Sequence, residues 1–180
     1  MRYITGEYAL NIPCSLPTTG DWHYHALNWQ RVRSQDTRTA FFGSYGIDRH
    51  SGLPGFDHEV LAANHIRACL DLLADNLFPL AQGMRNDFIG NDELNEEIFS
   101  QVWKLRNQIN WRDIDRFMES EYKLAWLDHK KDRHDDSISY NTSEEILDDI
   151  AEQDLLELLS LNDKMADHSK TGCREDIKVT

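Results

Sequence analysis

The chain has 180 residues and a formal net charge of −13, and its length fits one domain that carries an appendage. Its apolar runs fall well short of the ~20 residues that cross a bilayer, so we expect no membrane span. Residues 132–180 hold 14 acidic and 5 basic side chains, −9 of the total, which disfavours nucleic acid or anionic lipid as a partner and favours a basic protein.

The N-terminal residues and the cysteines indicate a cytoplasmic protein. Residues 1–7 lack the continuous apolar core of a signal peptide. Cys14, Cys69 and Cys173 are widely spaced and form no CxxC pair, which argues against a disulfide framework and a cysteine-rich zinc site. We expect Cys69 to be a buried thiol on a helix, and we expect no cofactor. Cys14 follows a proline in a loop, where a nucleophile would need a base that the sequence does not identify.

Residues 1–56 have the composition of extended and loop structure. They hold six of the nine glycines and three of the four prolines, with turn signals at 17–21 and 51–55. Short β-favouring runs, such as 39–42, lie between these turns. This segment is therefore predicted to form two to four short strands joined by ordered loops.

From Asp57 onward the hydrophobic residues recur with a helical period. We expect three helices, at about 57–78, 91–109 and 111–129, the first with Asp57 as its N-cap. The apolar stripe of the first helix leaves a polar side that should face away from the core, formed by Asn64, Arg67, Asp71 and Asp75.

These elements together predict an α+β fold. Three helices with apolar faces must pack on one another or on the N-terminal segment, so residues 1–131 should form a single globular domain. In that domain a short-stranded, loop-rich part, 1–56, packs on a mostly helical bundle, 57–131. Residues 132–180 follow as an acidic hinge, an amphipathic helix and a disordered tail.

The acidic helix begins with a capping box formed by Thr142 and Glu145. Two interpretations of this helix stay open. It packs on its own domain, or it docks in a groove on another chain. In the second case the expected partner-binding residues are the apolar Leu147, Ile150, Leu155 and Leu158 and the acidic Glu144, Asp148 and Glu152.

Residues 20–25, Gly-Asp-Trp-His-Tyr-His, are the densest cluster of chemically active side chains. In an extended strand, His23 and His25 would point to the same side with Cα atoms ~6.5–7 Å apart. Both rings could then reach one metal ion or one phosphate, with His50 among the candidates for a third ligand. The same pattern also fits ordinary packing and hydrogen bonding.

Three further patterns favour structural roles. His58 and His65 are seven residues apart, which corresponds to ~10.5 Å of helix rise. Two histidines at this separation cannot share one metal ion, so we expect helix-surface or cap roles for both. Residues 43–48 are glycine-rich, but the lysine or helix that a phosphate-binding loop needs does not follow directly, so we expect a turn. The arginines of 31–38 lie among aromatic residues, where they either bind an anion or base or form a solvated loop.

The motifs ITG at 4–6, ALN at 9–11, PC at 13–14, GDWH at 20–23 and GxYGI at 43–47 resemble a set of small bacterial proteins found near toxin–antitoxin genes. The resemblance covers about the first 50 residues. It implies an accessory or antitoxin-like role and assigns no site residues.

Two main hypotheses for function result. The first is a cytoplasmic regulatory protein, an antitoxin-like inhibitor, that masks a basic surface of a partner such as a toxin. The second is a small enzyme or a metal- or nucleotide-binding protein that uses His23, His25, Asp48 and His50. A structural subunit of a larger assembly is a third alternative. The charge distribution favours the first.

Overall fold

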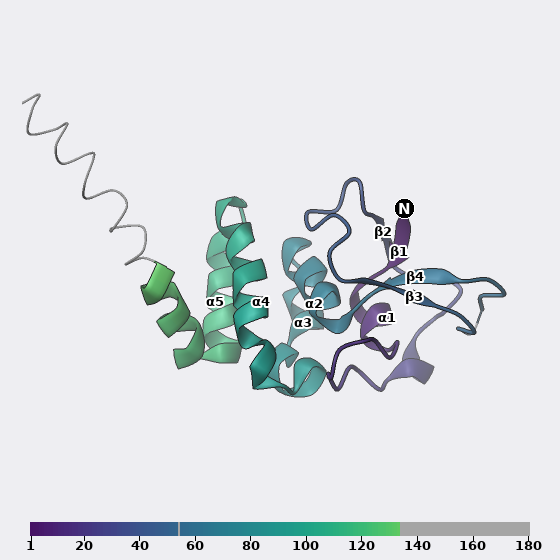
Figure 1. Cartoon of the computed structure of the whole chain (residues 1–180), viewed down its shortest axis with the longest axis horizontal. Coiled ribbons are helices and arrows are strands. Elements are labelled where there is room, and N and C mark those ends of the chain that lie inside the picture. The colour runs from purple at the N-terminus through teal and green to yellow at the C-terminus, as the bar shows by residue number, and fades with distance from the viewer. Residues whose placement is uncertain (54, 134–180) are drawn as a thin grey trace, which may run out of the picture. The chain divides into compact units, whose positions relative to one another are not determined.

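Four short strands form a mixed sheet in the computed structural model, which describes residues 1–53 and 55–133 (Figure 1). The strand order is β2-β1-β4-β3. The central pair, β1 and β4, is parallel, while β2 and β3 pair antiparallel with β1 and β4 at the two edges. The strands are β1 (Arg2–Ile4), β2 (Ser34–Asp36), β3 (Ile47–His50) and β4 (Val60–Ala63).

Three of these strands lie in the segment predicted to be extended, but β4 lies where a helix was expected. The prediction of a helix with Asp57 as its N-cap is wrong for residues 57–63, of which 60–63 form β4, because the apolar run Val-Leu-Ala-Ala fits a buried strand as well as a helix. The helix begins later, after the N-cap Asn64, whose side chain accepts a hydrogen bond from the backbone N–H of Arg67 at 2.9 Å.

Helical segments make up most of the remaining fold, so the α+β class is confirmed. The predicted helix at 91–109 is divided into three shorter elements, and the one at 111–129 is interrupted at Lys123, where φ is +51°. The elements are α1 (Gly6–Leu10), the 3₁₀ turn η1 (Tyr24–Ala26), α2 (His65–Ala74), α3 (Phe78–Ala81), the π-helical η2 (Met84–Ile89), η3 (Asp92–Leu94), α4 (Asn95–Trp103), η4 (Lys104–Asn107) and α5 (Trp111–Tyr122); residues 124–133 are also helical.

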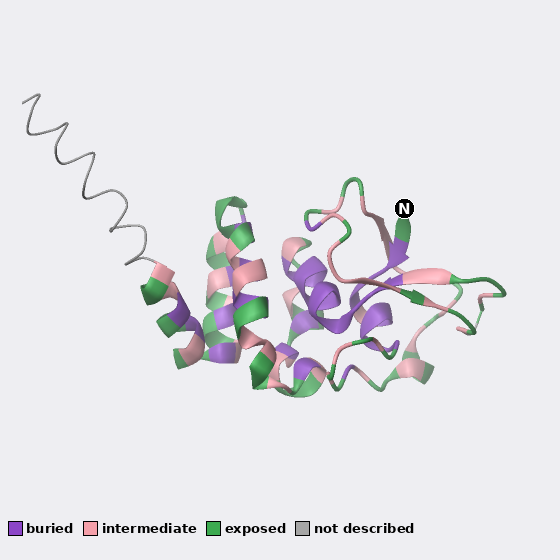
Figure 2. Cartoon of the chain, viewed as in Figure 1, coloured by how far each residue is buried: buried purple, intermediate pink, exposed green. Residues whose placement is uncertain are grey.

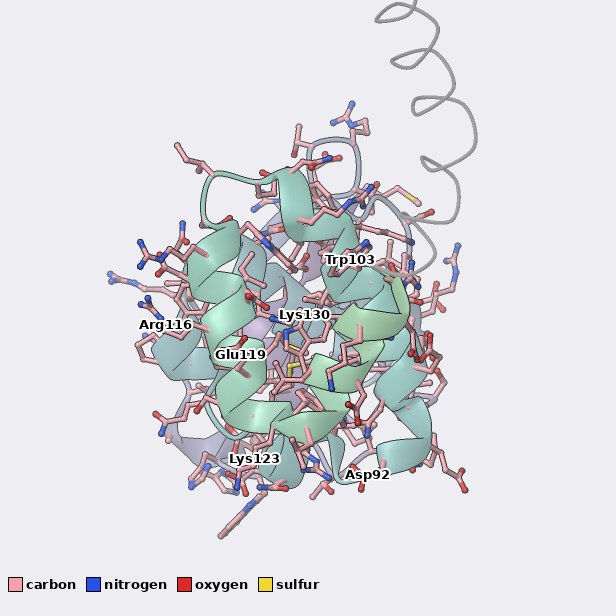
Figure 3. All side chains as sticks on the ribbon, turned by 90° about the vertical axis from the view of Figure 1, so that its left-hand side faces the viewer. Asp92, Trp103, Arg116, Glu119, Lys123 and Lys130 are labelled. Atoms are coloured by element: carbon pink, nitrogen blue, oxygen red, sulfur yellow. The ribbon has the colours of Figure 1, made fainter. Side chains whose placement is uncertain are left out.

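Helix α2 lies at the centre of the hydrophobic core. It contacts α1, β4, α3, α4 and η2, and its apolar side chains, Ile66, Cys69 and Leu70 among them, are fully buried (Figure 2). The expectation of a buried Cys69 thiol is confirmed, and this burial raises the pKa of the thiol. Figure 3 shows the helical side of the fold, with Trp103 at the end of α4 and the exposed Arg116 and Glu119 on α5.

The polar side of α2 was expected to face away from the core, and this is wrong for three of its four residues. Arg67 is 0% exposed, Asp71 is 3% exposed and Asn64 is also buried, while Asp75 is exposed. The sheet and the loop before β3 cover this side of the helix, so α2 is enclosed by its neighbours on both its apolar and its polar faces.

The buried charges of α2 form a connected hydrogen-bond network. Arg67 Nε donates to Asp71 Oδ1 at 2.8 Å, and the Arg67 guanidinium also donates to the Tyr45 carbonyl and to the Tyr3 hydroxyl, at 2.6 Å each. Asp71 Oδ2 accepts from the hydroxyls of Tyr3 at 2.8 Å and Thr5 at 2.6 Å. A buried ion pair satisfied in this way ties α2 to the first strand and to the loop before β3.

Residues 1–129 form one compact unit and residues 130–180 a second, of which the structure describes 130–133. The predicted partner-binding residues between 144 and 158, and Cys173, lie outside the described residues. Within the described part of the chain, no helix combines the length and the apolar character needed to span a bilayer.

Candidate functional site

The loop of residues 11–21 carries Cys14 and is held in place by backbone hydrogen bonds. The N–H of Asp21 donates to the carbonyl of Leu10, and the N–H of Gly20 donates to the carbonyl of Phe88, each at 2.7 Å. Pro13 directly precedes Cys14 and Pro17 follows three residues after it, and each proline fixes φ at its own position in the loop. A side chain on this loop is therefore held in a defined position.

A chain of three hydrogen bonds links this loop to the first residue of α2. Cys14 Sγ lies 3.5 Å from Thr18 Oγ1, and Thr18 Oγ1 lies 2.6 Å from His65 Nδ1. The other ring nitrogen, His65 Nε2, lies 2.9 Å from the carbonyl oxygen of Ile12. Cysteine, hydroxyl and imidazole are thus connected in series, although 51 positions separate Cys14 from His65 in the sequence.

The carbonyl of Ile12 fixes the direction of these hydrogen bonds. A carbonyl oxygen only accepts, so in the neutral ring the proton of His65 lies on Nε2, and Nδ1 is left as an acceptor. The Thr18 hydroxyl then donates to Nδ1, and its oxygen is free to accept from the Cys14 thiol. The arrangement leads the thiol proton toward the imidazole.

The surroundings of Cys14 favour its thiolate form. Partial burial raises the pKa of the thiol, but hydrogen bonding with the side chains of His65 and Thr18 and with the backbone of His65 and Leu16 outweighs this effect, and the pKa falls from 9.0 to about 7. The N–H of His65 belongs to the first turn of α2, where backbone donors lack intrahelical acceptors. Reactive cysteines typically occupy such sites.

Close packing around His65 holds the imidazole in place. The residue is 3% exposed, and Gly20 lies directly against the ring with φ at +69°. A Cβ atom on Gly20 would lie 2.5 Å from His65 Cε1, so the loop reaches this position only because residue 20 has no side chain. Of the two roles expected for His65, helix surface or cap, the surface role is wrong, because the residue is buried at the first position of α2.

Strand β3 adds polar groups beside the Cys14 loop. Asp48 Oδ2 accepts hydrogen bonds from the Ser15 backbone N–H at 3.2 Å and from its hydroxyl at 3.0 Å. His50 Nε2 is buried and has no hydrogen-bond partner among the described residues. Burial lowers the pKa of His50, and the charge of His65 lowers it further, against the opposing effect of Asp48. The lowered pKa favours the neutral form of the His50 ring.

His23 and His25 are not arranged as the predicted metal or phosphate site requires. His23 and His25 do not lie in an extended strand, because residues 24–26 form the 3₁₀ turn η1. His23 Nδ1 pairs with Asp21 Oδ1, and its ring stacks on Trp22, while His25 packs edge-on against Tyr24. Among the described residues, no group of three or more His, Cys, Asp or Glu side chains could hold a metal ion.

No family model, no curated protein and no solved structure matches this chain. Function is therefore inferred from the site itself, in which Cys14, Thr18 and His65 come together. The sequence pointed to Cys14 as a loop cysteine but identified no base for it, and it gave no indication of a role for Thr18. The sequence signal that bears on His65 is Asn64, a good N-cap residue after an apolar run, which places His65 in the first turn of a helix.

Proposed function

We propose that this protein acts as a cysteine-dependent enzyme in which Cys14 attacks an electrophilic carbon of the substrate and forms a covalent intermediate. The observation that carries the proposal is the hydrogen-bond chain from Cys14 Sγ through Thr18 Oγ1 to His65 Nδ1. A nucleophile linked to a base, with the base oriented by a third group, is the arrangement that nucleophilic catalysis requires. The Ile12 carbonyl supplies the orientation.

The proton and the electrons balance within this set of groups. The Cys14 thiol proton moves to Thr18 Oγ1 as the Thr18 hydroxyl proton moves to His65 Nδ1, which leaves a thiolate and an imidazolium. The thiolate electron pair forms an S–C bond to an acyl carbon, and the bond to the leaving group breaks. The imidazolium proton returns through Thr18 to the leaving group. A water molecule then cleaves the S–C bond and regenerates the thiol.

The substitution Thr18→Val tests this function, because valine has the same shape as threonine but interrupts the hydrogen-bond chain. The full chain with Cys173→Ser is treated with p-nitrophenyl acetate, which transfers an acetyl group to a reactive thiol. We expect an acetyl adduct on Cys14 in the intact-protein mass spectrum, and its slower formation in Thr18→Val. The control is Thr39→Val, whose threonine is exposed and lies outside the site.

The size of the effect at pH 7 follows from two opposing factors. If the thiol pKa rose fully from about 7 to 9.0, the thiolate fraction would fall about 50-fold, while the intrinsic nucleophilicity would rise about eightfold. The net loss of rate at pH 7 is then about sixfold; the two rates become about equal near pH 8, and at pH 9 Thr18→Val should react about fourfold faster. Acetylation of Cys14 at equal rates in Thr18→Val and Thr39→Val across this pH range would rule out the proposed role of the hydrogen-bond chain.

A second candidate function is the binding of a basic protein partner through residues 132–180. Its support is the concentration of charge, 14 acidic against 5 basic side chains, in a segment that follows a unit with its own hydrophobic core at 1–129. Long-range attraction would speed the encounter, and burial of Leu147, Ile150, Leu155 and Leu158 would slow release. An antitoxin-like inhibitor of a basic toxin is one form of this function.

A comparison of the full chain with a chain that ends at Lys131 tests the second function. Both are used to capture proteins from the native cells, and retained proteins are identified by mass spectrometry. We expect one basic protein that the full chain alone retains and that high salt releases. Retention of the same partner by both chains would show that the acidic segment is not the binding element.

A further inference from the structure

A groove of about 710 Å³ lies where the two central strands separate. Strands β1 and β4 are parallel, and Ile4 with Ala62 is the one register pair between them in the described residues. The groove is lined by residues that precede this pair on both strands, Arg2 and Tyr3 on β1 and Val60 and Leu61 on β4. Its volume falls in the range of small-molecule sites, ~300–1,000 Å³.

Aromatic and aliphatic side chains from two loops wall the groove. Trp29 and Val32 line it from the loop before β2, and Phe56 lines it from the loop before β4. Trp29 is held rigidly, because its Nε1 donates to the Tyr24 carbonyl at 3.0 Å and its ring packs against the ring of Tyr24, with a centroid distance of 4.5 Å. A rigid aromatic wall binds a flat ring with little loss of side-chain entropy.

Arg2 supplies a positive charge at the same groove. Its guanidinium donates to the Ser34 hydroxyl, and it forms no ion pair within the described residues. The other charged groups of the lining are balanced by neighbours: Glu59 pairs with Arg49 at 2.8 Å, and His58 lies 2.9 Å from Asp57. The arginine can therefore pair with an anionic group of a ligand.

We propose that this groove binds a small planar ligand, an aromatic or heteroaromatic ring that carries one carboxylate or phosphate group. The ring lies against Trp29 and Phe56, and the anion pairs with Arg2. The arginines of 31–38, which the sequence suggested as an anion site, do not supply this charge, because Arg33 pairs with Glu7, Arg38 pairs with Asp36, and Arg31 does not line the groove. The proposal does not depend on the chemistry of Cys14.

The test uses the full chain and two probes with the same rings, 2-naphthoate and the neutral 2-naphthalenemethanol. Binding is followed by NMR on the tryptophan indole N–H signals, assigned by single Trp→Phe substitutions. We expect saturable binding of 2-naphthoate that shifts the Trp29 signal and leaves that of Trp22, which is 82% exposed and outside the groove, unchanged. The neutral probe should bind about tenfold more weakly.

Arginine variants identify the source of this preference. Arg2→Gln should remove the tenfold difference between the two probes while leaving the fold intact, because Arg2 is exposed. Arg31→Gln is the matched control, since Arg31 is also exposed but does not line the groove, and it should keep the difference. The proposal is overturned if 2-naphthoate does not shift the Trp29 signal saturably, or if Arg2→Gln retains the full preference for the anion.

Discussion

The substitution Asp71→Asn keeps the size of the side chain but removes the charge that compensates Arg67. Arg67 is 0% exposed, and an arginine guanidinium keeps its proton in proteins. The variant therefore contains a buried cation without its carboxylate. Removing one partner of a buried ion pair costs about 3–5 kcal/mol. With an unfolding entropy of about 2.1 cal/mol/K per residue for the unit Met1–His129, this corresponds to a fall in Tm of about 11–18 °C.

Thermal unfolding of the full chain, followed by circular dichroism, measures this effect. The matched control is Asp75→Asn at the C-cap of α2, one turn after Asp71, where the carboxylate is exposed and accepts a hydrogen bond from Gln35 at 2.8 Å. We expect this control to change the free energy of unfolding by about 0.5 kcal/mol or less, ~2 °C in Tm. A loss of the same few degrees in both variants would refute the reasoning that Arg67 depends on Asp71 for charge compensation.

Four further outcomes are expected. Gly20→Ala should lower the free energy of unfolding in urea by at least about 1–2 kcal/mol, because it adds a Cβ atom at positive φ against His65. The pKa of Cys14 is lowered to about 7, so its thiolate stabilises the fold fully above pH 9, and this stabilisation is lost as the pH falls through 7. The fall in Tm caused by Cys14→Ser should therefore be larger at pH 9 than at pH 6. Cys69, with a raised pKa and full burial, should react with iodoacetamide in mass-spectrometric mapping only after unfolding. Trp22→Ala should leave Tm within about 2 °C, because the side chain is 82% exposed.

The sequence predicts the fold class because helical periodicity and turn signals are local properties. The apolar stripe of 111–122 depends on neighbours in the chain and is confirmed, and the three strands found in residues 1–56 agree with the two to four expected. The prediction for 1–56 is wrong at Gly6–Leu10, which form the helix α1, and at 39–42, which lie in turns. Strand β4 was missed because an unbroken apolar run has no period of its own. Whether it becomes strand or helix depends on pairing with β3 and with β1, and β1 lies far away in the sequence.

The burial of Arg67 and Asp71 could not be predicted for a related reason. Charged residues on one side of a helix usually face solvent, and the exception requires partners that only tertiary structure supplies. Those partners are the hydroxyls of Tyr3 and Thr5 and the carbonyl of Tyr45, all distant in sequence from α2.

The candidate site shows the same limit. Cys14 was recognised as a loop cysteine in need of a base, but His65 becomes that base only because the loop of residues 11–21 folds over the N-terminus of α2. Gly20 makes this close approach possible, and its role depends on the contact with the imidazole, which no local pattern encodes.

The most direct test of the account is a pH titration of the Cys14 thiolate, followed by its ultraviolet absorbance in the folded chain with Cys173→Ser. Cys69 is buried with a raised pKa, so Cys14 is the thiol that titrates in the neutral range. The account predicts a transition with a midpoint near pH 7 that is absent in Cys14→Ser. A midpoint near 9, the ordinary value for a free cysteine, would show that His65 and Thr18 do not activate this thiol, and it would contradict the proposed role of Cys14 as a nucleophile.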